Sequence, residues 1–298
     1  MIQVLLAGVY STIQDLGRFG HRNIGVPVSG SMDQYSAFIA NSLVGNSNHA
    51  AVLEMTFNGP FLKFNKNATI AIVGSPIKIK LNDNLLAQNS VITINKGDTM
   101  SLGTISHGVR SYLAIAGGFN TEVAINSRSY YPGITHKSQL KKGDIIHFNC
   151  HKQTEILNRS SVHLDEQHFS NKTLQVYPAP EFHTLSTEIK AKILRKKLIV
   201  SSSSNRMAYK FESPITIGPG DSINEIITSS VQPGTVQLTP SGEIIVLMRD
   251  CQTTGGYARI FQLTEQSINQ LSQKTTASEL KFSLVNSHKT NNLSLIHI

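Results

Sequence analysis

The sequence predicts a mainly β protein with a few helices, arranged as two β-barrel-like modules. Most of the chain alternates short β-rich segments with turn-forming residues, and these segments recur after roughly ten residues. Such regular spacing of short strands is typical of β-sandwiches and barrels. The length of 298 residues is enough for two domains.

The predicted strands are rich in β-branched and aromatic residues, and Asn, Gly, Asp and Pro separate them. The tripeptide Lys-Gly-Asp occurs at 96–98 and at 142–144, and each copy predicts a turn that leads into another strand. The strands expected from this pattern are Thr69–Val73, Ile77–Leu81, Val91–Ile94, Thr99–Leu102, Tyr112–Ile115, Ile145–Phe148, Leu198–Val200 and Ile244–Met248.

Three segments interrupt this rhythm and predict helices. The clearest lies near 33–44, where apolar residues recur at helical spacing and a Gly-Asn pair follows the end. Ser31 or Asp33 can cap its start. Further helices are expected over Ala50–Met55 and over Glu181–Leu194.

Changes in composition along the chain predict its domain organisation. An N-terminal module is expected at 1–150 and a C-terminal module at 173–285. The stretch 151–172 is polar, rich in His and weakly periodic, so we expect it to connect the modules. Residues 286–298 show no clear period and are expected to form a poorly ordered tail.

The overall composition excludes several classes of protein. Charged residues make up 15% of the chain and hydrophobic residues 40%, which is unlike a disordered chain or a coiled coil. The longest apolar runs, Val4–Ala7 and Ile244–Met248, are too short to span a membrane. The net charge of +8 is dispersed and lacks interleaved aromatic residues, so we expect no nucleic-acid partner.

The cysteine content and the N-terminus predict a cytoplasmic location. Two cysteines cannot build a disulfide framework, and the first residues lack the pattern of a secretory signal. The sequence also has no P-loop, nucleophile elbow or His-Glu-x-x-His motif. The 11 histidines are scattered, so we expect no metal site.

Four polar segments carry candidate binding residues, and the first is the glycine-rich loop before the helix near 33–44. It delivers Ser29, Gly30 and Ser31 to the helix start, where free backbone N–H groups can hold a carboxylate or phosphate. Asp33 lies in the first turn, where two roles are open for it. It caps the helix, or it acts on the substrate.

The second and third segments each carry an arginine. Arg128 lies between Ser127 and Ser129, and its planar guanidinium offers several donors to a carboxylate or phosphoryl group. Arg206 follows the predicted strand Leu198–Val200 and is another potential anion clamp. A structural salt bridge is the alternative interpretation for both arginines.

The fourth segment has the most specific pattern. A predicted buried strand, Ile244–Met248, precedes an amide, two hydroxyls and two glycines, which is typical of a polar site at the end of a barrel strand. The amide and hydroxyls supply neutral hydrogen bonds, and the glycines allow close approach of a ligand to the backbone. The candidate substrate-binding residues here are Gln237, Gln252, Thr253, Thr254, Gly255, Gly256 and Tyr257.

Together, these segments resemble the biotin-dependent carboxyltransferase family, which includes KipA, the C subunits of 5-oxoprolinases and proteins like subunit 2 of allophanate hydrolase. The resemblance spans about residues 1–285, and its most specific motifs are Gln-Asp-Leu-Gly-Arg and Gln-Thr-Thr-Gly-Gly-Tyr. The matching segments are Thr12–Gly20, Gly25–Asp33, Asn41–Asn46, Leu53-Glu54, Gly59-Pro60, Tyr112–Gly118, Ser127–Ser129 and Gln252–Tyr257.

This resemblance implies a cyclophilin-like C-terminal module and two partners, the KipI-like B subunit of 5-oxoprolinase together with its A subunit. It also implies an ATP-dependent 5-oxoprolinase complex that opens 5-oxo-L-proline to L-glutamate, with this chain inactive alone and the ATP site unassigned. The candidates for catalysis are Asp33, Arg128 and Gln252. Arg128 and Arg206 would stabilise the anionic tetrahedral species that forms when the ring opens.

The chain departs from the family pattern at several positions, and two other functions are open. Either it is a KipA-like regulatory protein that binds a KipI-like partner, or it is the carboxyltransferase component of a biotin-dependent carboxylase. In the latter case the biotin carrier would be separate, because no Met-Lys-Met motif occurs here. The departures are Phe19 for Pro, Asn205 for Asp, Ala208 for Gly, Ser241 for Asp, Cys251 for Arg and Ala258 for Pro.

Overall fold

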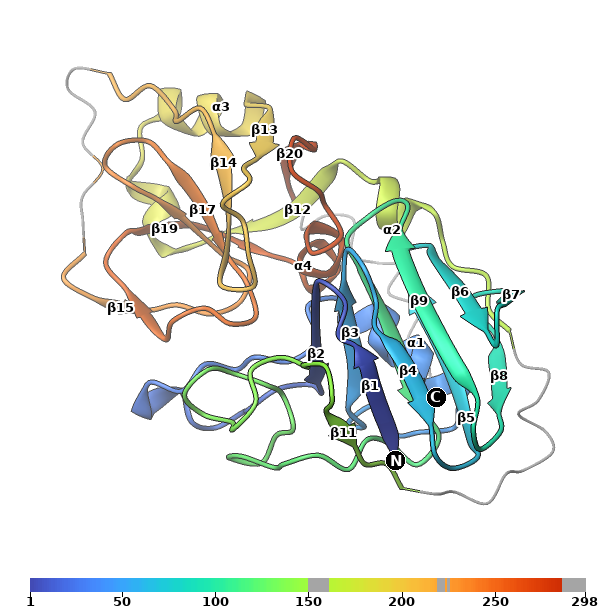
Figure 1. The fold of residues 1–298 in the computed structure, drawn as a ribbon. Coiled ribbons are helices and arrows are strands. Elements are labelled where there is room, and N and C mark those ends of the chain that lie inside the picture. Colours follow the sequence, from blue (N-terminus) through green and yellow to red (C-terminus); the bar gives the residue numbers. More distant parts are fainter. Residues whose placement is uncertain (150–160, 219–222, 224–225, 286–298) are drawn as a thin grey trace.

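The computed structural model describes residues 1–149, 161–218, 223 and 226–285. Within these ranges the chain is mainly β, as predicted, and forms two antiparallel sheets and a closed barrel (Figure 1). The predicted tail at 286–298 lies outside the described residues. The described part of the chain contains no helix with the length and apolar character that crossing a bilayer requires.

The N-terminal strands divide between two sheets that share one apolar core. The strands are β1 (Ile2–Leu6), β2 (Tyr10–Gln14), β3 (Val52–Thr56), β4 (Phe61–Phe64), β5 (Ala68–Gly74), β6 (Ile77–Leu81), β7 (Asn84–Leu86), β8 (Val91–Ile94), β9 (Thr99–Ile105), β10 (Arg110–Ile115) and β11 (Ile145–Ile146). One sheet has the order β11-β1-β4-β9-β6-β7, and the other has the order β2-β3-β10-β5-β8. Apolar side chains of both sheets, such as Leu62 and Leu113, are fully buried between them.

The helix predicted over Ala50–Met55 is wrong, because Val52–Met55 lie in β3. All five residues of β3 are buried, and the strand is paired on both edges, with β2 and β10. A strand buried on both faces has a nearly continuous apolar sequence. Such a run cannot be told from a buried helix by periodicity alone.

The helix predicted near 33–44 is confirmed as α1 (Gln34–Leu43). Asp33 caps it, because its Oδ1 accepts a hydrogen bond from the backbone N–H of Ser36 at 3.2 Å. Ala37 and Ala40 pack against the face of the five-stranded sheet that points away from the shared core. The cap therefore holds the start of α1 in place beside the five-stranded sheet.

The C-terminal strands close into a barrel in the order β12-β19-β16-β17-β14-β13-β20. Its first and last strands, β12 and β20, are parallel neighbours. The barrel strands are β12 (Thr173–Pro178), β13 (Leu198–Val200), β14 (Ala208–Glu212), β16 (Thr235–Leu238), β17 (Ile244–Leu247), β19 (Ala258–Leu263) and β20 (Glu279–Leu284). Outside it, β15 (Ser229–Ser230) pairs with β18 (Thr254–Gly255).

Helices flank the barrel and the connection that leads to it. The helix predicted over Glu181–Leu194 divides into the 3₁₀ helix η3 (Pro180–Thr184) and α3 (Thr187–Arg195), while α4 (Glu265–Leu271) follows β19. The predicted connection at 151–172 lies outside the described residues up to 160, and its later part contains α2 (Gln167–Ser170). Buried His168 of α2 contacts the Asp33 carboxylate at 2.8 Å, so this part is tied to the start of α1.

The side chain of Gln273, just after α4, joins the barrel to the sheets. Its Oε1 accepts hydrogen bonds from the backbone N–H of Arg110 at 2.8 Å and from Ser75 Oγ at 2.9 Å. Its Nε2 donates to Asp33 Oδ2 at 2.7 Å. Gln273 is 2% exposed, so water cannot replace these bonds. The Gln273 amide therefore links the segment after α4 to the sheets and to the start of α1.

Replacing Gln273 with Leu is expected to lower the free energy of unfolding by about 3 kcal/mol, because several buried polar groups lose their partner. Chemical denaturation measures this change. Gln266→Leu on exposed α4 surface is the matched control and should change stability by about 0.5 kcal/mol or less. Equal effects of the two substitutions would show that the Gln273 amide does not hold the junction together.

Candidate functional site

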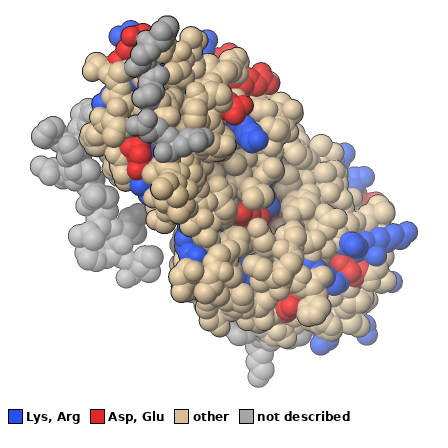
Figure 2. Space-filling view, turned by 90° about the vertical axis from the view of Figure 1, so that its left-hand side faces the viewer, with Lys and Arg blue, Asp and Glu red and all other residues tan. Residues whose placement is uncertain are grey.

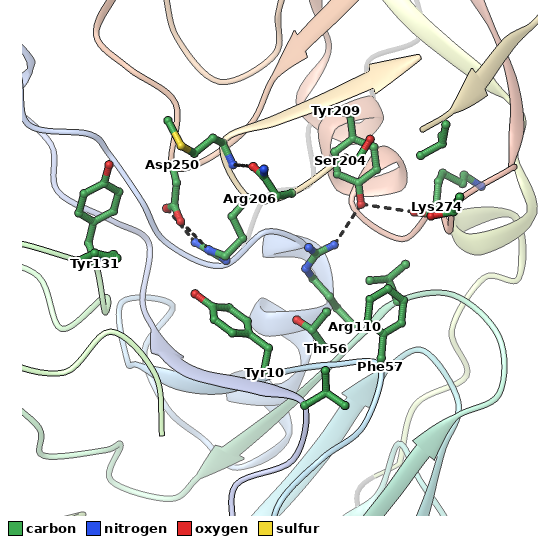
Figure 3. Close-up of a pocket in the computed structure, with 17 residues that line it drawn as sticks. Tyr10, Thr56, Phe57, Arg110, Tyr131, Ser204, Arg206, Tyr209, Asp250 and Lys274 are labelled. Carbon is green, nitrogen blue, oxygen red and sulfur yellow. Dashed lines mark hydrogen bonds and ion pairs between the residues drawn. The ribbon is translucent and has the colours of Figure 1, made fainter. Parts of the chain in front are cut away.

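A cavity of about 480 Å³ lies where the barrel meets the sheets. Figure 2 shows basic and acidic atoms in the hollow between the upper and lower parts of the molecule. Apolar side chains, including Val109 and Val200, form part of the cavity wall. Its polar residues come from both modules and include Tyr10, Thr56, Arg110, Tyr131, Arg206, Tyr209, Asp250 and Lys274 (Figure 3).

Arg206 is the centre of the polar wall. Its Nε and Nη2 donate to the two carboxylate oxygens of Asp250 at 2.7 and 3.0 Å, and its Nη1 forms an ion pair with Glu54 of β3. Nη2 also donates to the carbonyl of Gly30 at 2.7 Å. Arg206 thus binds two carboxylates and the loop before α1. Of the two interpretations of Arg206, an anion clamp or a structural salt bridge, the geometry shows the salt bridge.

Arg110, at the start of β10, extends this network. Its Nε lies 3.8 Å from Glu54 Oε1, and its Nη1 donates to the hydroxyl of Tyr209 at 3.2 Å and to the carbonyl of Ser272. Two arginines therefore face two carboxylates, Glu54 and Asp250, in a region where all four side chains are buried. The network is formally neutral.

The network keeps its arginines charged. Burial alone would lower the pKa of Arg206, but the charges of Asp250 and Glu54 together raise it above its ordinary value. The pKa of Arg110 is also raised, since Tyr209 and Glu54 outweigh the opposing effect of burial. Both guanidiniums stay protonated at any physiological pH, so neither can act as a proton donor or acceptor.

Two tyrosine hydroxyls in the cavity are available for a ligand. Tyr10 and Tyr131 are half-buried, and neither hydroxyl has a hydrogen-bond partner among the described residues. Burial raises the pKa of both side chains, so both remain protonated near neutral pH. The cavity can therefore offer two neutral O–H donors beside the Arg206 network.

The first predicted segment reaches this site through its backbone. The Ser29 N–H donates to the carbonyl of Arg249 at 2.9 Å, and the Gly30 carbonyl accepts from Arg206. Gly30 has a φ of +92°, and a Cβ there would lie 2.7 Å from the Leu16 carbonyl oxygen. Ser29 is fully buried. The loop therefore supports the cavity wall.

Asp33 is fully buried and does not line the cavity. Its Oδ2 accepts hydrogen bonds from Ser36 Oγ and Gln273 Nε2, both at 2.7 Å, and contacts His168 Nε2 at 2.8 Å. Burial raises the pKa of this carboxyl, but the hydrogen bond from His168 and the other donors lower it overall. Of its two predicted roles, the structure shows the cap.

The segment Ser127–Ser129 is organised by Asp15. The Asp15 carboxylate accepts from the hydroxyls of Ser127 and Ser129 at 2.7 and 2.6 Å and from the Arg128 N–H at 2.6 Å. The Arg128 guanidinium donates to the carbonyl of Thr121. These residues do not line the cavity, and their role in substrate binding stays a prediction.

The Gln252–Tyr257 segment lies at the surface beside β15. Gln252, Thr254 and Tyr257 are exposed, and the Thr253 carbonyl accepts from Arg22 at 3.4 Å. Neither Gln237 nor any residue of this segment, Gly256 included, lines the cavity. A Cβ at Gly255 would lie 2.7 Å from Nε2 of buried Gln237, so a larger residue there would make this amide shift. Substrate binding by this segment remains a prediction.

Sequence reasoning misses most of the charged residues of the site. It does not single out Glu54, Arg110 and Asp250 as site residues, although two of them leave a visible signal. Glu54 is the one charged residue of the apolar strand β3, and Arg110 begins the fully buried strand β10. A charge inside a buried strand requires a partner of opposite charge. Among the described residues, no cluster of His, Cys, Asp or Glu is suited to a metal ion.

Comparisons with known proteins agree with this architecture. The C subunit of 5-oxoprolinase from Escherichia coli (strain K12) is 32% identical over 286 residues, which is 95% of this chain and 90% of that protein. The crystal structure of TTHA0988 matches with a TM-score of 0.82 and 25% identity, covering 95% of this chain and 55% of that one. The Kluyveromyces lactis urea carboxylase matches with a TM-score of 0.81 and 27% identity.

The shares of chain length differ among these relatives. The match to urea carboxylase covers 96% of this chain but 27% of that one. This chain thus spans about half of TTHA0988 and about a quarter of the carboxylase.

The family described as "Carboxyltransferase domain, subdomain A and B" matches residues 24–284. The chain therefore belongs to this carboxyltransferase-domain family.

Proposed function

We propose that this chain is the C subunit of an ATP-dependent 5-oxoprolinase. In this proposal it acts with the A and B subunits to open 5-oxo-L-proline to L-glutamate and is inactive alone. The observation that carries the proposal is the alignment with a 5-oxoprolinase C subunit over 90% of that protein's length. The alignment covers 95% of this chain, so it extends over both the sheets and the barrel.

The chemistry of the cavity is compatible with a small lactam. Its volume of about 480 Å³ is within the range of small-molecule sites. 5-Oxo-L-proline presents a lactam carbonyl that accepts hydrogen bonds, an apolar ring and a carboxylate. The hydroxyls of Tyr10 and Tyr131 can donate to the carbonyl, while Val109 and Val200 can contact the ring. Donors held in place in this way also stabilise an oxygen that becomes negative during ring opening.

The surface segments would then act in the assembled complex. We propose that Arg128, Gln252, Thr254 and Tyr257 contribute to the site only once the A and B subunits are bound. They lie outside the cavity in the isolated chain, and the last three are exposed. We also propose that the complex uses ATP and that it is located in the cytoplasm.

A second candidate function is carboxyl transfer in a biotin-dependent carboxylase. The observation that favours it is the match of 96% of this chain to a urea carboxylase with a TM-score of 0.81. This chain would then catalyse transfer of a carboxyl group from carboxybiotin on a separate carrier to an acceptor substrate, which leaves free biotin on the carrier. The non-enzymatic alternative is that this chain is a KipA-like regulatory protein, which requires association with a KipI-like partner but no turnover.

The proposal is tested by mixing the purified chain with the A and B subunits, ATP and 5-oxo-L-proline. We expect release of glutamate and ADP from the complete mixture, and none from the chain alone. Omitting this chain or ATP provides the controls. Stable association of a folded mixture without glutamate release would contradict the 5-oxoprolinase and favour the regulatory alternative. Carboxylation by a biotin carboxylase and carrier would favour carboxyl transfer.

Removing the two free hydroxyls tests whether the cavity holds the substrate. Tyr10→Phe and Tyr131→Phe should each raise the KM for 5-oxo-L-proline by about two- to tenfold, because each loses one hydrogen bond of about 0.5–1.5 kcal/mol. The melting temperature should not change. Tyr177→Phe, on exposed β12 surface, is the control. Unchanged kinetics in both cavity variants would place the substrate elsewhere.

A further inference from the structure

A second cavity adjoins the first one at the junction of the two modules. It has a volume of about 600 Å³ and lies between the 105–108 turn, the end of α2 and the 273–280 segment. Phe57 and Lys274 line both cavities, so these two side chains form a shared wall. Its size is sufficient for a ligand as large as a nucleotide.

Lys274 is a buried cation without a carboxylate partner. It is 6% exposed, and its Nζ donates one hydrogen bond, to the carbonyl of Phe169 in α2. No ion pair joins it to an acidic residue in the described part of the chain. An ammonium has three N–H donors, so two remain available for a ligand.

The surroundings of Lys274 add positive charge. Burial and the neighbouring charge of Lys172 lower the pKa of Lys274 to about 8. Lys172 itself is exposed and lines the same cavity. The one carboxylate of the lining, Glu279, lies 3.4 Å from Lys197 in another ion pair.

Other buried cations of the junction, unlike Lys274, are paired with carboxylates. Arg206 lies against Asp250 and Glu54, and Arg249 forms an ion pair with Glu265. A buried charge without a partner is costly, and an anionic ligand would remove this cost. The cavity also carries two aromatic rings, Phe57 and Phe169, which can contact the flat face of a base.

We propose that the second cavity binds a nucleoside polyphosphate, with the phosphates at Lys274 and Lys172. The two lysines supply charge-assisted hydrogen bonds to phosphate oxygens, and the hydroxyls of Ser278 and Thr275 lie in the same lining. This inference deepens the proposed function, because it gives ATP a place in this chain. Its test measures binding directly, so it can fail or succeed independently of 5-oxoprolinase activity.

The test is calorimetric titration of the full chain with ATP, pyrophosphate, inorganic phosphate and adenosine. We expect ATP to bind more tightly than pyrophosphate, and both to bind more tightly than inorganic phosphate or adenosine. Lys274→Met should weaken ATP binding at least about tenfold, because a hydrogen bond to a charged group is lost. Lys274→Arg should retain most of the affinity, and Lys172→Met should weaken binding to a smaller extent.

Lys63→Met on exposed β4 surface is the matched control, because Lys63 lines neither cavity. It should bind ATP like the unmodified chain. Absence of ATP binding at millimolar concentration would overturn the proposal. So would an ATP affinity of the Lys274→Met variant equal to that of the unmodified chain. Lys274 would then serve only to bind the Phe169 carbonyl at the end of α2. Equal binding of ATP and inorganic phosphate would overturn the nucleotide as the occupant. If Lys274→Met does not fold, Lys274→Arg and Lys172→Met still decide the question.

Discussion

The buried ion pairs of Arg206 with Glu54 and Asp250 determine how the two halves of this protein fit together. Glu54 lies on a strand of the N-terminal sheets, while Arg206 and Asp250 belong to the barrel module. A buried charge that loses its partner destabilises a protein far more than an exposed one does. The modules must therefore meet in the orientation that pairs these groups, and this orientation creates the cavity lined by Arg110 and Tyr209.

The pairing also determines what the first cavity can recognise. Arg206 makes four hydrogen bonds to Asp250, Glu54 and the Gly30 carbonyl, so its charge is compensated before any ligand arrives. The part of the first cavity beside Arg206 is consequently suited to neutral hydrogen-bonding groups and apolar surface. The uncompensated charge is that of Lys274, which lies in the wall shared by the two cavities, and an anion has more to gain from binding there.

The sequence is a good guide where structure is decided locally. The strands Ile77–Leu81, Val91–Ile94 and Leu198–Val200 have the predicted bounds, because turn residues delimit them and apolar residues alternate or cluster within them. Arg206 is identified from its loop, but its partner Glu54 lies 152 positions away in the chain. No spacing rule links two such positions, and only the closed fold brings them together.

The most specific motif of the sequence, Gln252–Tyr257, lies outside the first cavity, and its role in substrate binding stays a prediction. Gln252–Tyr257 has the residue types of a binding loop, yet a Cβ at Gly255 would lie 2.7 Å from Nε2 of Gln237, and the Thr253 carbonyl accepts a hydrogen bond from Arg22 at 3.4 Å. Packing thus accounts for part of the motif, and its exposed side chains lie outside the cavity lining. In an enzyme built from several subunits, a loop can carry binding chemistry that one chain does not enclose. Without its partners, this chain provides two adjoining cavities, one suited to a neutral lactam ring and one suited to an anion.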